Sequence, residues 1–464
     1  MIGAASATPI PDGDAVFFLP CAVDLATGKG LTHPFYAVIP DNPARLCVWH
    51  GWFFPYLTAL LPWSRSYATV GISLQLTGLA CLGLAVWALL RVGRGTPQLA
   101  AVSCLPMTLL IQAQIGRPEP IVTGCAAGIA LVVASGWPSL AKQIAWGALL
   151  GIIAVTSPAA GVAYAIVSVM LCVMMARSFA AAAIGAGLIA TASLAVLLIA
   201  TVALAPTPLT TWLWGIATNV RVQYVERTSA ASLIEYYVTS AHFPGLVVYL
   251  ACLAAAAVAI VSGVSGWRRW GLLVLLLALF AFVYRMALRL PETSYNFLAL
   301  TPVVVAVSLV LARSRGIMGP CLTGALVLQA SVAAAGLAYQ DASTLAALRG
   351  LGAQAFEQRI RAALSSRPGV VAADPPLAVV ISNALGPTRV QARLGTSIGA
   401  RVDYLALHQA NSAFAQPPSV PGFKLLTNGF GPAPRLLGVK IGHTPKDWSY
   451  AIYCRASACP AGIE

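Results

Sequence analysis

Two aspartates in the segment PDGDAVFF (residues 11–18) are the side chains best suited to chemistry in this sequence. Asp12 and Asp14 lie beside a glycine and lead into an apolar stretch, and a third acid, Asp24, follows them. A carboxylate held beside a membrane can act as a general base toward a hydroxyl or an amine. The alternative role is structural, because Asp14 is also placed to cap a helix that begins at Ala15.

Other candidates lie near the ends of apolar runs. Arg285 and Arg289 end one such run, where ionisable side chains are costly; binding a phosphate and snorkelling to the membrane surface are the two interpretations. Arg117 and Glu119 are suited either to the same site or to a structural ion pair. His50 is suited to acid–base work, to acceptor binding or simply to packing in its aromatic stretch. We find no metal cage, phosphate loop or dinucleotide motif, so we expect no cofactor; a divalent metal is not indicated.

The elements that must position these residues are membrane helices. The 464 residues have a mean hydropathy of +0.81 and only 9% charged residues, against about 25% in ordinary globular domains. Apolar runs of about 20 residues are long enough to cross a bilayer as helices. We predict ten spans, at 67–90, 97–115, 119–136, 140–156, 158–176, 180–205, 243–264, 270–290, 295–312 and 317–339.

Charge predicts the orientation of these spans. Every second connection carries only basic residues, namely Arg91, Arg94, Lys142, Arg177, Arg268, Arg269, Arg313 and Arg315. The other connections hold all eight acids that precede residue 340, namely Asp12, Asp14, Asp24, Asp41, Glu119, Glu226, Glu235 and Glu292. Cytoplasmic loops collect arginine and lysine, so we place the acids outside. The net charge of +14 therefore reflects topology rather than nucleic-acid binding. We also expect a further hydrophobic helix upstream, to deliver the acidic segment outward.

Three regions follow from this reading. Residues 1–66 form an outer segment with membrane-surface helices, and 67–339 form the helical bundle with an outer loop at 206–242. Residues 340–464 carry more charge and predict a small extracytoplasmic α/β domain. Its helix is predicted at 341–366, and its strands at 377–382, 401–407, 422–427, 435–441 and 448–454. The expected fold is thus an all-α polytopic membrane bundle with an appended α/β domain.

Four cysteines lie in the regions assigned to the outside. Cys21 and Cys47 flank the opening loop, and Cys454 and Cys459 close the chain. In an oxidising compartment each pair can form a disulfide. A zinc half-site is the competing interpretation for the C-terminal pair, but it lacks a second half.

The opening segment resembles the first outer loop of the GT-C glycosyltransferases. The likeness is to the bacterial branch related to protein O-mannosyltransferases and lipid A aminoarabinose transferases. It is carried by an acid before aromatic residues, then LATGKGLTHPFY and WHGWFFPYLTALL, and more loosely by QIGRPEPIVTG and YNFLALTPVVVAVSLVL. Asp14 precedes Gly28 by fourteen residues, which matches the spacing of the family's catalytic base. Residues 1–14 do not match the family's first helix, and Ala15 stands where many members have glutamate.

The resemblance implies a GT-C fold and an inverting transfer of a hexosyl or pentosyl group. The donor would be a polyprenyl-phosphate-linked sugar, and the acceptor a lipid, glycan or protein on the outer face of a bacterial inner membrane. Asp14 or Asp12 would be the base; Arg285, Arg289 and Arg117 would bind the donor phosphate; and His50, Glu119 and Tyr295 would contact the sugar or the acceptor. A transporter is a rival, although the span centres hold almost no ionisable residue. A non-catalytic envelope scaffold is another.

Overall fold

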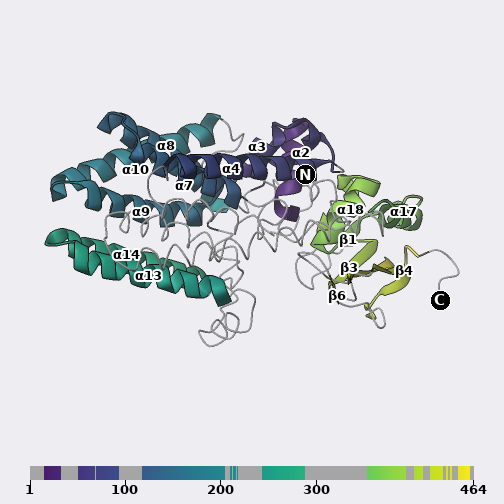
Figure 1. Ribbon diagram of the computed structural model, residues 1–464. Helices are drawn as coiled ribbons and strands as arrows, with labels where there is room; N and C mark the ends of the chain where they lie inside the picture. Colours follow the sequence, from purple (N-terminus) through teal and green to yellow (C-terminus); the bar gives the residue numbers. More distant parts are fainter. Residues whose placement is uncertain are drawn as a thin grey trace.

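The structure is a computed structural model. It describes residues 15–32, 47, 51–67, 69–92, 118–203, 210–211, 213–215, 217, 243–287, 353–392, 402–410, 418–431, 435–436, 439–440 and 448–459. The described part is mostly helical, with a bundle of long apolar helices and a small sheet domain at one end of it (Figure 1).

Seven helices of the bundle fall on predicted spans. They are α4 (Val70–Val92), α7 (Glu119–Ala134), α8 (Ser139–Thr156), α9 (Pro158–Met175), α10 (Phe179–Ala203), α13 (Phe243–Gly263) and α14 (Trp267–Ala287). Four of them contain stretches long and apolar enough to cross a membrane, at 139–156, 158–175, 179–203 and 267–285. The predicted spans 97–115, 295–312 and 317–339 lie outside the described residues, so the count of ten stays a prediction.

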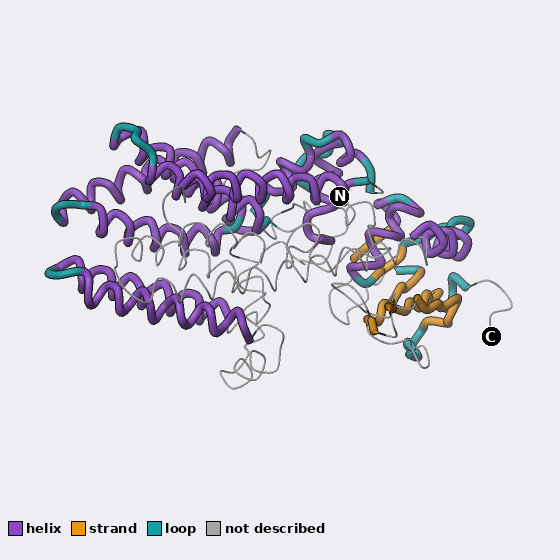
Figure 2. Tube along the Cα trace, viewed as in Figure 1, coloured by secondary structure: helices purple, strands orange, loops and turns teal. Residues whose placement is uncertain are grey.

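The bundle has two chemically different ends. Short connections at 135–138, 176–178 and 264–266 lie together at one end (Figure 2). We call this the basic end, because Arg91, Lys142, Arg177, Arg268 and Arg269 lie on or next to the helix termini there. The opposite end carries α2 (Ala15–Ala26) and α3 (Phe53–Ala59), and we call it the acidic end (Figure 1). It holds Asp24 and Glu119, the only acids among the described residues of 15–287.

Aromatic and basic side chains mark the basic end as a water–lipid boundary. Trp137, Trp267 and Trp270 are exposed there, as expected for tryptophans at a headgroup layer. Lys142 Nζ donates to the Val133 carbonyl at 3.3 Å, and Arg269 Nε donates to the Val264 carbonyl at 2.7 Å. These side chains therefore satisfy backbone oxygens where a helix ends.

Two glycines allow α8 and α10 to pack closely. A Cβ on Gly151 would lie 2.7 Å from the Ser193 carbonyl oxygen and 2.9 Å from Val196 Cβ. One turn earlier, a Cβ on Gly147 would lie 2.6 Å from Ala192 Cβ. Small residues at this spacing let membrane helices approach until their backbones touch.

We therefore expect Gly151→Val to destabilise the bundle by about 2 kcal/mol, because added methyl groups must force the two helices apart. Thermal unfolding in detergent measures the effect. Gly187→Val is the matched control, since Gly187 lies on α10 with open space where its Cβ would be. Equal unfolding temperatures for the two variants would show that the α8–α10 contact is not close-packed.

The C-terminal domain has one five-stranded sheet with helix α18 (Pro375–Leu385) packed against it, and helix α17 (Ala353–Leu364) packs against α18. The strands are β1 (Val371–Ala373), β2 (Val390–Ala392), β3 (Tyr404–Ala410), β4 (Phe423–Gly431) and β7 (Trp448–Arg455), in the order β2-β1-β3-β7-β4. β1 pairs in parallel with β2 and β3, whereas β7 is antiparallel to β3 and β4. A separate hairpin pairs β5 (Arg435–Leu436) with β6 (Val439–Lys440). The predicted α/β domain is confirmed.

The strand predicted at 377–382 is wrong, because these residues lie in α18. Val379, Val380 and Ile381 are β-branched, which favours a strand. The residues on either side of this segment favour a helix instead. Pro375 and Pro376 occupy the first helical positions, and Gly386 ends the helix at a φ of 91°. The short strands β1 and β2, on either side of this helix, were not predicted.

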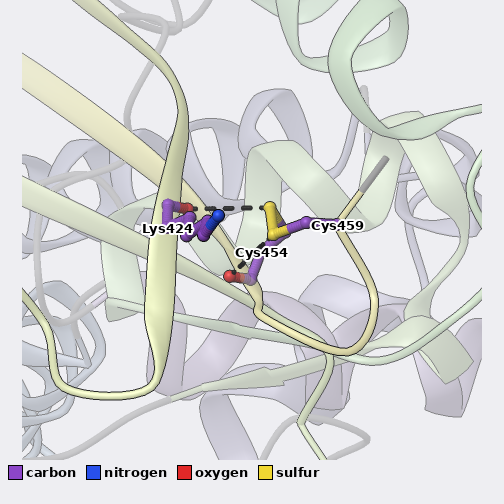
Figure 3. The surroundings of a disulfide bond; sticks show 3 residues. All are labelled: Lys424, Cys454 and Cys459. Carbon is purple, nitrogen blue, oxygen red and sulfur yellow. Dashed lines mark hydrogen bonds between the residues drawn. A yellow bond between two sulfur atoms is a disulfide. The ribbon is translucent and has the colours of Figure 1, made fainter. Parts of the chain in front are cut away.

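Both predicted disulfides are present. Cys454 and Cys459 bond across a turn at the end of β7, with their Cα atoms 5.2 Å apart (Figure 3). Cys454 Sγ also lies 3.6 Å from the Lys424 carbonyl oxygen of the neighbouring strand β4 (Figure 3). Cys21 and Cys47 form the other bond, with their Cα atoms 6.0 Å apart. The bonded C-terminal pair excludes the zinc half-site.

Candidate functional site

Two of the predicted site residues are described, and both lie at the acidic end. Glu119 is the first residue of α7 and is 6% exposed. Arg285 lies in the last turn of α14, at the end opposite the basic connection, and its side chain is exposed. Asp12, Asp14, His50, Arg117, Arg289 and Tyr295 lie outside the described residues. Helix α2 begins at Ala15, the residue that follows Asp14.

Helix α2 ends in a glycine turn that the GKG sequence dictates. Gly28 has a φ of 79°, a left-handed conformation that favours glycine. Its N–H donates to the Leu25 carbonyl at 3.1 Å, and the Lys29 N–H donates to the Asp24 carbonyl at 2.8 Å. This pair of hydrogen bonds is the Schellman helix end. Gly30, at a φ of 83°, then turns the chain back toward the bundle.

The turn closes over the carboxyl group of Asp24, which is 3% exposed. Thr32 Oγ1 donates to Asp24 Oδ2 at 2.6 Å. Lys29 Nζ lies 3.8 Å from Oδ1, and its side chain is 58% exposed. Among the described residues, Oδ1 has no hydrogen-bond donor. A buried carboxylate with so little compensation is expensive, and such groups concentrate at functional sites.

Burial shifts the protonation of both Asp24 and Tyr67. Burial raises the pKa of the Asp24 carboxyl above its ordinary value, and the Thr32 hydrogen bond and Lys29 only partly oppose this. Burial, with a further contribution from the negative charge of Asp24, raises the pKa of the Tyr67 hydroxyl. The charged carboxylate is thus disfavoured in the folded protein, which suits Asp24 to taking up or holding a proton.

This direction predicts how stability depends on pH. Because folding raises the pKa of Asp24, its contribution to stability is fully present below the unfolded value of about 3.9 and is lost as pH rises through the folded value. We expect Asp24→Asn to flatten the loss of stability between acidic and neutral pH. Unfolding temperatures of the wild type and the variant, measured on both sides of this window, give the result. A variant with the wild-type pH slope would place the titrating group elsewhere.

The interior of the acidic end is unusually polar. Within the described residues, the buried atoms Trp52 Nε1, Thr58 Oγ1 and Ser73 Oγ have no hydrogen-bond partner, like Asp24 Oδ1. Trp52 directly precedes α3, Thr58 lies in α3 and Ser73 lies in α4. Helix α2 packs against both α3 and α4. Buried polar atoms normally have a hydrogen-bond partner. Several buried atoms without one in a single region therefore indicate a site for polar contacts.

The aromatic stretch after the opening loop helps to build this end. Trp52 is completely buried and packs with the Cys21–Cys47 disulfide, Leu31 and Val155. The ring of Phe54 meets that of Phe18 edge to face, with centroids 5.4 Å apart. Gly51 lies against the backbone carbonyls of Val155 and Thr156. Trp52 and Phe54 are therefore packed inside the protein.

Metal-binding groups and pockets are the other features that could mark a functional site. The described residues contain no group of three or more histidine, cysteine or acidic side chains that could hold a metal. An open hollow of about 590 Å³ in the C-terminal domain is lined by Ser365, Ser366, Pro368, Gly369, Val370 and Arg389. Arg389 donates there to the carbonyls of Gly369 and Arg367. It therefore holds the loop that leads into β1.

The sequence drew attention to Asp24 as an acid but gave it no role. Its burial, Thr32 and Tyr67 were missed. The available signal was a lone acid near the end of an apolar helix, followed by a glycine turn and a threonine.

Compared with known proteins, the chain matches no family model, no curated protein and no solved structure.

Proposed function

We propose that this protein is an integral-membrane glycosyltransferase. It moves a sugar from a polyprenyl-phosphate carrier to an acceptor on the outer face of the membrane. One observation carries the proposal: helix α2 of the acidic opening segment is packed into the end of the bundle that also holds Glu119, and Asp14 directly precedes this helix in the sequence. The resemblance of LATGKGLTHPFY to a GT-C outer loop supports the same reading.

The proposed reaction is a single displacement at the anomeric carbon. Asp14 or Asp12 takes the proton of the acceptor hydroxyl or amine while that group attacks. The bond from the anomeric carbon to the phosphate oxygen breaks, so the configuration inverts. Arg285, with Arg289 and Arg117, neutralises the phosphate that leaves. Arg285 supports this role through its place in the last turn of α14, at the acidic end.

The test is a transfer assay with purified protein in lipid, labelled polyprenyl-phosphate sugars and a panel of lipid, glycan and peptide acceptors. We expect acceptor-dependent transfer with release of the carrier phosphate. Sugar-independent movement of a solute into sealed vesicles, with no transfer to any acceptor, would instead identify a transporter.

Sidedness follows from the same charge pattern. We propose that the basic end faces the cytoplasm of a bacterial cell, because cytoplasmic connections collect arginine and lysine. The acidic end and the C-terminal domain then face outward, where the two disulfides are stable.

Variants in which a single exposed serine is replaced by cysteine test this orientation. Ser265 lies in the 264–266 connection of the basic end, and Ser365 lies in the C-terminal domain. With a membrane-impermeant maleimide, we expect Ser365→Cys to react in cells whose inner membrane is intact and Ser265→Cys to react only after that membrane is opened. The reverse pattern would invert the proposed topology.

A further inference from the structure

Helix α18 of the C-terminal domain is buried around its whole circumference. Leu377, Ala378 and Ile381 are fully buried, and Val379, Val380 and Ala384 are nearly so. A helix that is apolar and buried on every side must have packing partners on every side. The sheet covers one side, and α17 lies along another, where Arg361 donates to the Asn383 carbonyl at 3.2 Å.

Among the described elements, α2 of the opening segment also packs against α18. The two helices contact each other, and α18 lies between α2 and the sheet (Figure 1). One apolar core runs through both, from Phe18, Leu19, Ala22 and Val23 to the side chains of α18. The C-terminal domain is therefore packed onto the acidic end.

The helical spacing of α2 indicates which of its flanks makes this contact. Phe18 faces Phe54 of α3, Cys21 bonds to Cys47, and Asp24 accepts a hydrogen bond from Thr32. Leu19 and Val23, which are one turn apart on the helix, are also buried. They lie on the other flank of α2 from these three side chains, and we assign the contact with α18 to them.

We propose that the C-terminal domain, through the contact of α18 with Leu19 and Val23, is the positioning element of the acidic opening segment. This inference rests on the proposed function for its effect on turnover. Helix α2 has twelve residues and is about 18 Å long, and Leu19 lies about one turn from Ala15, so packing of Leu19 constrains the start of the helix. Holding α2 against the bundle thereby holds Ala15, the residue that follows Asp14 in the chain, at the acidic end. The domain acts on the rate of transfer, whereas binding of the lipid donor belongs to the bundle.

The experiment uses the full chain with a protease site inserted after Gly350. After cleavage in detergent, the C-terminal domain should stay with the bundle on gel filtration. Val23→Asp should release it, because the substitution places a charge between two packed helices. Ser365→Asp is the matched control, since Ser365 is exposed in the same domain. Separation of the cleaved wild-type parts would overturn the proposal.

Two further readouts separate positioning from simple loss of structure. Amide exchange of α2 should rise by about tenfold or more when the domain is released, while that of α9 stays unchanged. Turnover should fall by about 10- to 100-fold with an unchanged Kd for the donor. Val23→Ile should retain both. If Val23→Asp does not accumulate, Leu19→Ala gives the same comparison with a smaller change.

These readouts also distinguish this inference from the proposed function. Co-elution and amide exchange need no substrate, so they decide the docking even if the wild type transfers no sugar. Release of the domain with wild-type turnover would refute its positioning role while leaving the enzyme class intact.

Discussion

Asp14→Asn is expected to reduce sugar transfer by about 100-fold or more, because the variant removes the base that takes the acceptor's proton. Asparagine has nearly the same size and cannot accept that proton. A group that acts mainly in the transition state affects turnover more than donor binding. The variant should therefore insert normally and bind the polyprenyl-phosphate sugar with the wild-type Kd. Initial rates of label transfer and an equilibrium binding measurement give the two numbers.

Two other variants serve as comparisons. Asp12→Asn should have a milder effect, since Asp14 has the better spacing to Gly28. Arg285→Ala should weaken donor binding through loss of a phosphate contact. If Asp12→Asn is inactive while Asp14→Asn is fully active, the base is Asp12 rather than Asp14. Full activity of both variants and of the double variant would make the acids structural and remove the main support for a glycosyltransferase.

Loss of the Cys21–Cys47 disulfide should have the largest effect on stability. The bond joins residues 26 positions apart, and the chain-entropy estimate for such a loop is about 3.5 kcal/mol. The disulfide also packs against Trp52 and Leu31, so its loss loosens the core that supports α2. We expect Cys47→Ser, or reduction of the wild type, to lower Tm and to increase amide exchange in residues 15–32.

The C-terminal disulfide is a control within the same chain. Cys454 and Cys459 are five positions apart, and the same estimate gives about 2 kcal/mol. Cys459→Ser should therefore lower Tm less, and its effect should stay within the sheet domain. Unchanged exchange in α2 after removal of the Cys21–Cys47 bond would show that packing alone holds the helix.

The sequence was most informative where one physical requirement dominates. In lipid, a backbone must satisfy its own hydrogen bonds, so long apolar runs predict helices. All seven described bundle helices lie on such runs, and their limits differ from the predicted ones by no more than a few residues. Ser157 and Pro158 show why, because the serine side chain accepts from the Ala160 N–H and the proline occupies the first turn of α9.

The candidate site was less predictable because it depends on burial. The local sequence around Asp24, a lone acid before a glycine turn and a threonine, does not show that its carboxyl is buried. Its carboxyl becomes unusual only when other parts of the chain bury it and Thr32 returns through the glycine turn to donate a hydrogen bond to it. No periodic pattern in the sequence signals burial by other parts of the chain.

By itself, then, the sequence determined the helical membrane bundle, the separation of acidic from basic connections, the helix that begins after Asp14 and the cysteine pairs able to bond. Each depends on local composition or on spacing along the chain. Only the tertiary structure decided that Trp52 is buried and that the C-terminal domain packs onto α2. The reason is the same in each case: the free energy of burying an apolar surface depends on which distant surface meets it.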